Sequence, residues 1–97
     1  MLTSQGLDFL QRQIQKNLSH GTFRIDGSLK TIPIYKINKK SSILQIMLYV
    51  TEEFAGRITE YSLVVKTGEV LMTKTDSIVK DNKRGLILVF DLETKEA

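Results

Sequence analysis

The second half of the chain, residues 43–92, constrains the fold most, because apolar-rich runs alternate there with short polar turns. The runs stand in the sequence as ILQIMLYVT, ITEYSLVVKTGEVLMTKTD and DNKRGLILVFDLE. Short segments rich in Val, Ile, Leu and Tyr, bounded by Gly, Asn or Asp, are typical of strands joined in hairpins. The pattern therefore predicts an antiparallel sheet made of consecutive strands.

We expect strands at 22–26, 31–37, 43–51, 58–66, 70–75 with a short extension at 77–79, and 86–92. A Lys-Thr-Gly-Glu sequence separates the fourth run from the fifth and has the composition of a hairpin turn. Gly68 in this turn is predicted to take a positive φ, which glycine adopts without steric cost.

An amphipathic segment, LTSQGLDFLQRQIQKNL, precedes the strands and predicts a helix that begins near Thr3 or Ser4. Its apolar stripe, spaced by three and four residues, consists of Leu7, Leu10, Ile14 and Leu18. The helix is expected to end at residues 19–21, with Gly21 as a left-handed cap.

Together these elements predict an α+β fold with one N-terminal helix packed on an antiparallel β-sheet or small β-sandwich. Residues 1–97 are expected to form a single domain, with 93–97 as a frayed tail. The predicted core consists of Leu7, Leu10, Ile14, Leu18, Ile46, Leu48, Leu63, Val65 and Leu88.

Composition excludes several classes of site. The chain has no cysteine, so it cannot form disulfides, use a thiolate nucleophile or bind zinc through thiolates. No apolar run approaches the roughly 20 residues of a membrane helix, and the N-terminal residues lack the pattern of a signal peptide. A net charge of +3 permits nucleic-acid binding without requiring it.

No catalytic constellation is visible in the sequence. His20 is the only histidine, and the phosphate-binding glycine motifs and the G-x-S-x-G elbow are both missing. Glu60 and Asp76 could face each other across a hairpin, although solvated charges explain them more simply. We therefore expect a non-enzymatic protein with no cofactor and no metal site.

The segment 31–37 is the candidate interface. Pro33 cannot donate a hydrogen bond to a sheet, so this strand is expected to lie at an edge or to carry a bulge. Since the helix covers only one face of the sheet, some apolar side chains of this segment should be available to a partner. The candidate interface residues are Ile32, Ile34, Tyr35 and Ile37, next to a group of lysines expected to tune partner choice.

Three segments in order resemble the small N-terminal domain of bacteriophage tail-collar and tail-fibre proteins. LTSQGLDFLQRQI is similar to the opening helix of that family, and TFRIDGS to its strand that runs into a glycine turn. ITEYSLVVKTGEVLMTKTDS is similar to its later hairpin, in which Glu60 and Gly68 match the signature glutamate and glycine. A looser likeness relates the chain to small β modules of siphophage tail tips and receptor-binding proteins.

Either resemblance implies a structural or accessory part of a phage tail or adsorption apparatus, acting through protein–protein contacts. The implied partners are a second copy of the chain or another tail protein, in the virion tail or in the host cytoplasm during infection. A chain of 97 residues without the long fibre of those proteins would be a stand-alone accessory protein.

The alternative is a small OB-like nucleic-acid-binding module, which would need a basic sheet face with exposed aromatic side chains. Tyr49 and Tyr61 lie in apolar runs and are expected in the core, which leaves Tyr35 as the best exposed aromatic. Nucleic acid is therefore the less expected partner, and no membrane contact is expected.

Overall fold

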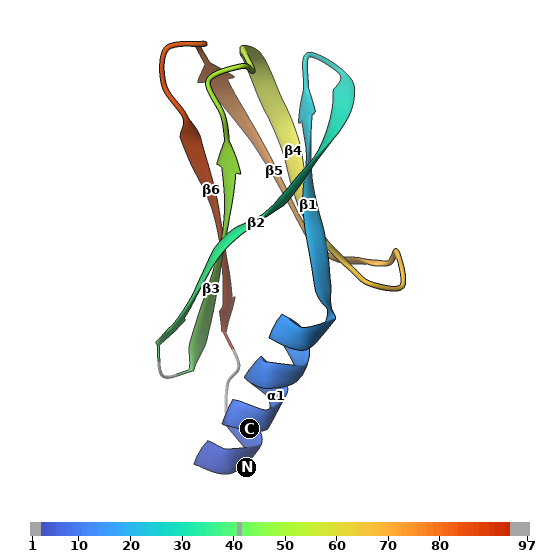
Figure 1. Cartoon of the computed structure of the whole chain (residues 1–97), viewed down its shortest axis with the longest axis vertical. Helices are drawn as coiled ribbons and strands as arrows, with labels where there is room; N and C mark the ends of the chain where they lie inside the picture. Colours follow the sequence, from blue (N-terminus) through green and yellow to red (C-terminus); the bar gives the residue numbers. More distant parts are fainter. Residues whose placement is uncertain (1–2, 41, 94–97) are drawn as a thin grey trace.

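The computed structural model describes residues 3–40 and 42–93 (Figure 1). Its elements are α1 (Ser4–Asn17), β1 (Leu18–Ile25), β2 (Ser28–Lys40), β3 (Ile43–Val50), β4 (Gly56–Val65), β5 (Val70–Lys80) and β6 (Leu86–Glu93). Of the predicted frayed tail, Glu93 instead ends β6, and residues 94–97 lie outside the described part of the chain.

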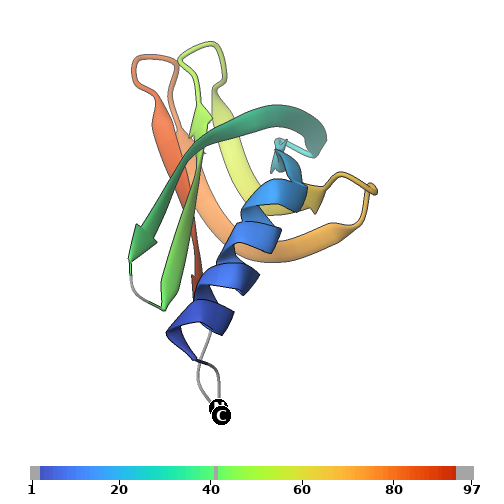
Figure 2. The ribbon, with the colours of Figure 1, turned by 60° about the horizontal axis from the view of Figure 1, so that its bottom comes forward.

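The six strands form one antiparallel sheet in the order β5-β4-β1-β2-β3-β6. The sheet curls until it is nearly a barrel, and the helix packs at one end of it (Figures 1 and 2). The predicted α+β class, one helix on an antiparallel sheet, is confirmed. A side-chain hydrogen bond spans the seam between the two outer strands, from Lys74 Nζ to the carbonyl oxygen of Val89 at 3.2 Å.

The core lies inside the curl, on the concave face of the sheet. Its fully buried members come from both halves of the sheet, and Tyr61 of β4 meets Phe90 of β6 edge to face, with 5.2 Å between ring centroids. The largest fully buried apolar side chains are Phe23, Phe90, Leu44, Ile46, Leu48, Ile58, Leu63, Leu88 and Val50. The sheet therefore supplies its own core, because its two outer strands approach each other across the curl.

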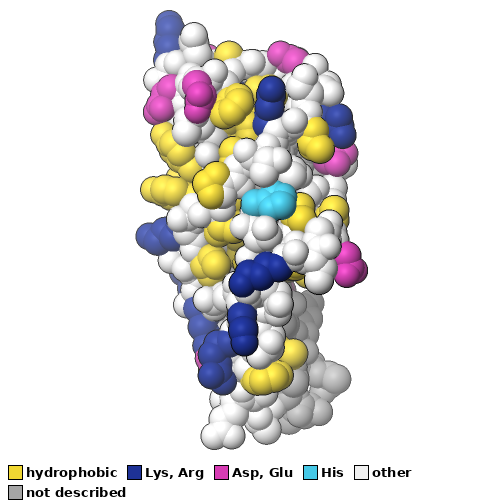
Figure 3. All heavy atoms as spheres, turned by 45° about the vertical axis from the view of Figure 1, so that its right-hand side comes forward, with side chains coloured by type: hydrophobic (Ala, Val, Ile, Leu, Met, Phe, Trp, Pro, Cys, Tyr) yellow, Lys and Arg dark blue, Asp and Glu magenta, His cyan; other side chains and the backbone are white. Residues whose placement is uncertain are grey.

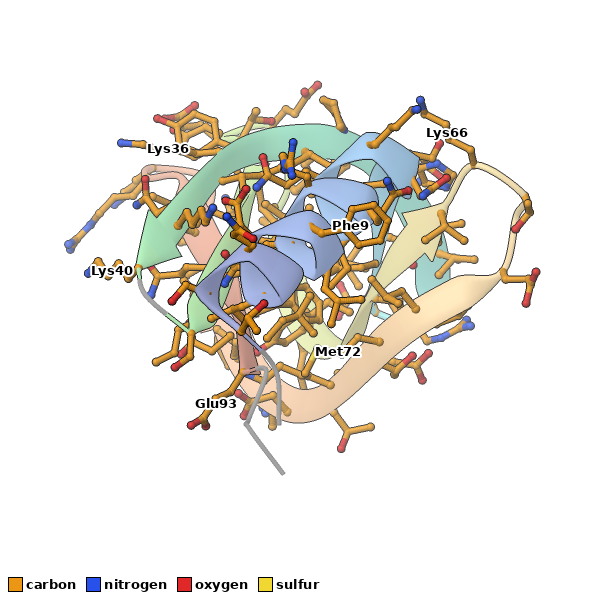
Figure 4. All side chains as sticks on the ribbon, turned by 90° about the horizontal axis from the view of Figure 1, so that it is seen from below. Phe9, Lys36, Lys40, Lys66, Met72 and Glu93 are labelled. Atoms are coloured by element: carbon orange, nitrogen blue, oxygen red, sulfur yellow. The ribbon has the colours of Figure 1, made fainter. Side chains whose placement is uncertain are left out.

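The helix covers the end of the curled sheet instead of one of its faces (Figures 2 and 4). Its first turn is capped by Thr3, whose Oγ1 accepts a hydrogen bond of 2.9 Å from the backbone N–H of Gly6. Gln11 is buried against the sheet and Ile14 packs on the core, but Leu10 remains 38% exposed. The prediction that Leu10 is a core residue is wrong. A helix that lies across the open end of the sheet buries a narrower stripe of side chains than a helix that lies along a sheet face.

The predicted glycine cap of the helix is also wrong. The chain passes from Asn17 directly into β1 at Leu18, and Gly21 is an inner residue of that strand. A side chain at Gly21 would collide with Leu48, so glycine is needed there for packing across the core. By contrast, Gly68 takes a φ of +93° in the turn between β4 and β5, as predicted.

The strand β2 is not an edge strand, which corrects the first of the two expectations drawn from Pro33. It lies between β1 and β3, and Pro33 falls where the strand changes partner: His20↔Pro33 is the last pair with β1, and Ile34↔Leu48 is the first with β3. The second expectation, a bulge, is met two residues later. Between Ile34 and Lys36 the register with β3 shifts, and the extra residue is Tyr35.

Candidate functional site

A cleft opens where β2 separates from β3, next to the connection between β3 and β4. Its volume is about 350 Å³. The side chains around it are mostly apolar or aromatic, with two threonines and one carboxylate: Thr31, Ile32, Pro33, Tyr35, Tyr49, Thr51, Glu53 and Phe54. A concave, largely apolar site with a few placed polar groups is the usual form of a binding site.

The bulge in β2 places Tyr35 at the mouth of this cleft. An extra residue in a strand redirects its side chain, and Tyr35 stands out from the sheet with 57% of its surface exposed. Its ring lies beside that of Tyr49 from β3, with 5.4 Å between centroids and an angle of 34° between planes. The two rings form a tilted stack, an arrangement that aromatic pairs favour.

Tyr49 is held from two further sides. Its hydroxyl donates a hydrogen bond of 3.0 Å to Glu52 Oε1. Its ring packs on the backbone at Gly85, where any side chain would collide with it. The hydrogen bond to Glu52 raises the pKa of Tyr49 above its usual value, with smaller contributions from desolvation and from the charge of Glu52.

The connection between β3 and β4 supplies the remaining polar groups. Glu53 Oε1 accepts a hydrogen bond of 2.9 Å from Thr51 Oγ1. The pKa of Glu52 is lowered, chiefly by a hydrogen bond from its own backbone N–H and then by the hydroxyl of Tyr49. Beneath them, the ring of Phe54 meets Phe23 of the core edge to face at 5.1 Å, so the cleft rests on packed core.

The strand segment beside the cleft has a free edge. Within the described chain, the pairing of β2 with β3 begins at Ile34, so residues 28–33 pair with β1 on one side only. Backbone N–H and C=O groups on an unpaired strand side can bond an added strand. Pro33 limits such pairing at its own position, since it has no N–H.

The structure places the four candidate interface residues in different environments. Ile32 is buried, at 7% exposure, and contributes to the cleft wall, whereas Tyr35 is exposed at its mouth. Ile34 and Ile37 are half-buried against the core and are not among the residues that line the cleft. The cleft therefore unites Ile32 and Tyr35 and leaves out the other two.

Sequence reasoning missed the partners that β3 and the following connection bring to the site. Tyr49 was expected in the core because its neighbours are apolar, and nothing in the sequence relates Glu53 or Phe54 to Tyr35. Only the register of β2 with β3 brings these residues together.

The other candidate sites stay apart. The register places Glu60 opposite Thr75 and not opposite Asp76, whose carboxylate accepts a hydrogen bond of 2.8 Å from the backbone N–H of Ser77. His20 Nδ1 lies 2.9 Å from Ser19 Oγ. Across residues 3–40 and 42–93, His, Asp and Glu side chains form no group of three that could hold a metal ion. The single helix of this described region is too short and too polar to cross a membrane.

No protein-family model, curated protein or solved structure matches this chain.

Proposed function

We propose that the chain is a non-enzymatic interaction module that docks an extended segment of a partner protein in the cleft between β2 and β3. The observation that carries this proposal is the coincidence of the cleft with an unpaired strand side at residues 28–33. Peptides that add a strand to a sheet gain affinity from backbone hydrogen bonds and specificity from adjacent side-chain pockets. In this chain the unpaired strand side and the side-chain pocket lie next to each other.

The cleft is also prepared for binding. Tyr49 is fixed by Glu52 and by the backbone at Gly85, and Phe54 is fixed on the core. A site whose side chains are already held loses little conformational entropy when a ligand arrives. Tyrosine is enriched among the residues that contribute most to binding at protein interfaces, and Tyr35 stands exposed beside the half-buried ring of Tyr49.

The proposed setting is a phage tail or adsorption apparatus, with another tail protein or a second copy of the chain as the partner. This setting rests on the three segments that resemble tail-collar and tail-fibre domains. The gene neighbourhood tests it: we expect adjacent genes for distal tail, tape-measure or tail-lysin proteins. Neighbouring genes of cellular metabolism would contradict it.

A selection from a yeast-displayed library of random peptides tests the docking. We expect enriched peptides whose affinity falls about tenfold or more with Tyr35→Ser, because truncation of an interface tyrosine commonly costs more than 1 kcal/mol. Phe9→Ser is the matched control: Phe9 is also an exposed aromatic residue, at 52%, but it lies on α1, away from both the cleft and the unpaired strand side. Failure to enrich any peptide, or equal losses in both variants, would contradict the proposal.

One observation favours the second candidate, an OB-like nucleic-acid-binding module. The strand β2 carries exposed lysines on both sides of Tyr35, and Lys36 and Lys40 project outward from it (Figure 4). Lys and Arg side chains also form a run along the lower part of the face in Figure 3. Asp8 offsets part of this charge through ion pairs with Lys39 and Arg12.

Fluorescence anisotropy with labelled single-stranded DNA and RNA separates the two functions. A nucleic-acid module would bind both probes and would lose affinity steeply with added salt. We expect no salt-sensitive binding at physiological ionic strength.

A further inference from the structure

The cleft differs in charge from the lysine-rich strand beside it. Among its lining residues, all of which the structure describes, one is acidic and none is basic. The acidic residue is Glu53, and Glu52 lies next to it and reaches the hydroxyl of Tyr49. A ligand group that enters this space meets the carboxylate of Glu53 and the neighbouring rings of Tyr35 and Tyr49. Glu52 lies just outside the lining, at the hydroxyl of Tyr49.

Aromatic rings and carboxylates prefer the same kind of ligand. The face of an aromatic ring is electron-rich and attracts a cation within about 6 Å of its centroid. Tyr35 presents an exposed ring, and Tyr49 lies beside it at 5.4 Å. A lysine or arginine side chain can lay its apolar stem along such rings while its charge reaches an acid beyond them.

We propose that the cleft selects a docked segment that places a Lys or Arg side chain against Tyr35 and Tyr49, with its charge toward Glu52 and Glu53. This inference rests on the proposed docking of an extended segment and adds the chemistry by which the segment is recognised. The occupant is thus a basic extended peptide from a partner protein.

The two carboxylates are oriented before the ligand arrives. Thr51 holds Glu53 and Tyr49 holds Glu52, each by one hydrogen bond. The lowered pKa of Glu52 keeps its carboxylate ionised under ordinary conditions. The positive charge of Lys80 contributes to this lowered pKa and offsets part of the charge of Glu52, whereas three backbone carbonyl oxygens hold its Nζ in place.

The experiment takes one enriched peptide from the library and a variant of it in which a Lys or Arg is replaced by Gln. Their affinities are measured for the parent protein, for the double variant Glu52→Gln/Glu53→Gln and for Glu69→Gln. The last is a matched control, because Glu69 accepts the same kind of threonine hydrogen bond, from Thr67 at 3.2 Å, in the turn between β4 and β5. Thermal unfolding checks that all three proteins are folded.

We expect the Gln peptide to bind the parent and Glu69→Gln about tenfold more weakly than the basic peptide. Against the double variant the two peptides should bind within about twofold of each other, because the carboxylates that distinguish them are gone. Peptides that depend on Tyr35 but share no basic position would overturn this inference and leave the docking proposal standing. Peptides that bind regardless of Tyr35, or an empty selection, would overturn both.

Discussion

The two ends of the curled sheet are closed by different means. At one end, helix α1 lies across the opening and buries Gln11 against it (Figure 2). At the other end no helix is present among the described residues, and the connections β1–β2, β3–β4 and β5–β6 lie there (Figure 1). There a buried lysine, Lys80, which is 5% exposed, ties two of the connections together.

Lys80 joins two connections of the chain. Its Nζ donates hydrogen bonds to the carbonyl oxygens of Phe54 at 2.7 Å, Asp81 at 2.8 Å and Arg84 at 2.9 Å. Phe54 belongs to the connection after β3, which forms the cleft, and the other two belong to the connection after β5. The first end is thus covered by helix α1. The second end is held by individual hydrogen bonds between connections, which leave room for a binding site.

The largest effect expected from this difference is at Lys80. Replacement by Met keeps the apolar stem but leaves three carbonyl oxygens without their donor, at a cost of about 3 kcal/mol in the free energy of unfolding. Urea denaturation of the parent, Lys80→Met and Lys83→Met measures it. Lys83 is exposed in the connection that follows Lys80, so its change should stay within about 0.5 kcal/mol. Equal stabilities of the two variants would mean that Lys80 does not hold this end together.

At the helix end we expect smaller losses in the free energy of unfolding, and their size should depend on how far each side chain is buried. Ile14→Ala should lower the free energy of unfolding by about 1–2 kcal/mol, since Ile14 is half-buried against the core. Leu10→Ala should cost less than about 1 kcal/mol, because Leu10 is 38% exposed. The reverse order in urea denaturation would show that the helix lies along a face of the sheet and not across its end.

The smallest expected effect is on the titration of Tyr49 beside the cleft. Its pKa lies above the ordinary value of 10.0, because the neutral hydroxyl donates to Glu52, and burial and the charges of Glu52 and Tyr35 add to the shift. The stabilisation from this raised pKa is complete below pH 10.0 and is lost as pH rises through the folded-state value. Ring resonances of Tyr49 followed by NMR should titrate above pH 10.0 in the parent and lower in Glu52→Gln. An unchanged midpoint would show that the hydrogen bond does not form in solution.

Local signals in the sequence predicted the helix, the strands and one turn better than they predicted the contacts between them. Apolar spacing predicted the helix, alternation and turn residues predicted most strands, and the turn composition predicted the positive φ of Gly68. These features depend on neighbours in the chain, so a single sequence contains them.

The cleft end depends on contacts between distant residues. The change of partner along β2 and the bulge at Tyr35 arise only when β1, β2 and β3 pair in a particular register. The burial of Lys80 arises only when the connections after β3 and β5 come together. Pro33 was the one local signal, because it predicted a strand that cannot pair regularly. It did not distinguish a strand at the edge of the sheet from an inner strand that changes partner. Ile32 and Tyr35 were therefore identified as candidates, and Tyr49, Glu53 and Phe54 were not.

The most direct test of the account is to map where a peptide binds. We would titrate an enriched peptide into the ¹⁵N-labelled protein and follow backbone amide resonances. The account predicts that the largest shifts fall in residues 29–35 and 49–54, around the cleft, with little change in α1 or in the turn at Gly68. Shifts concentrated on α1 or on the outer strands β5 and β6 would contradict the claim that the cleft is the docking site.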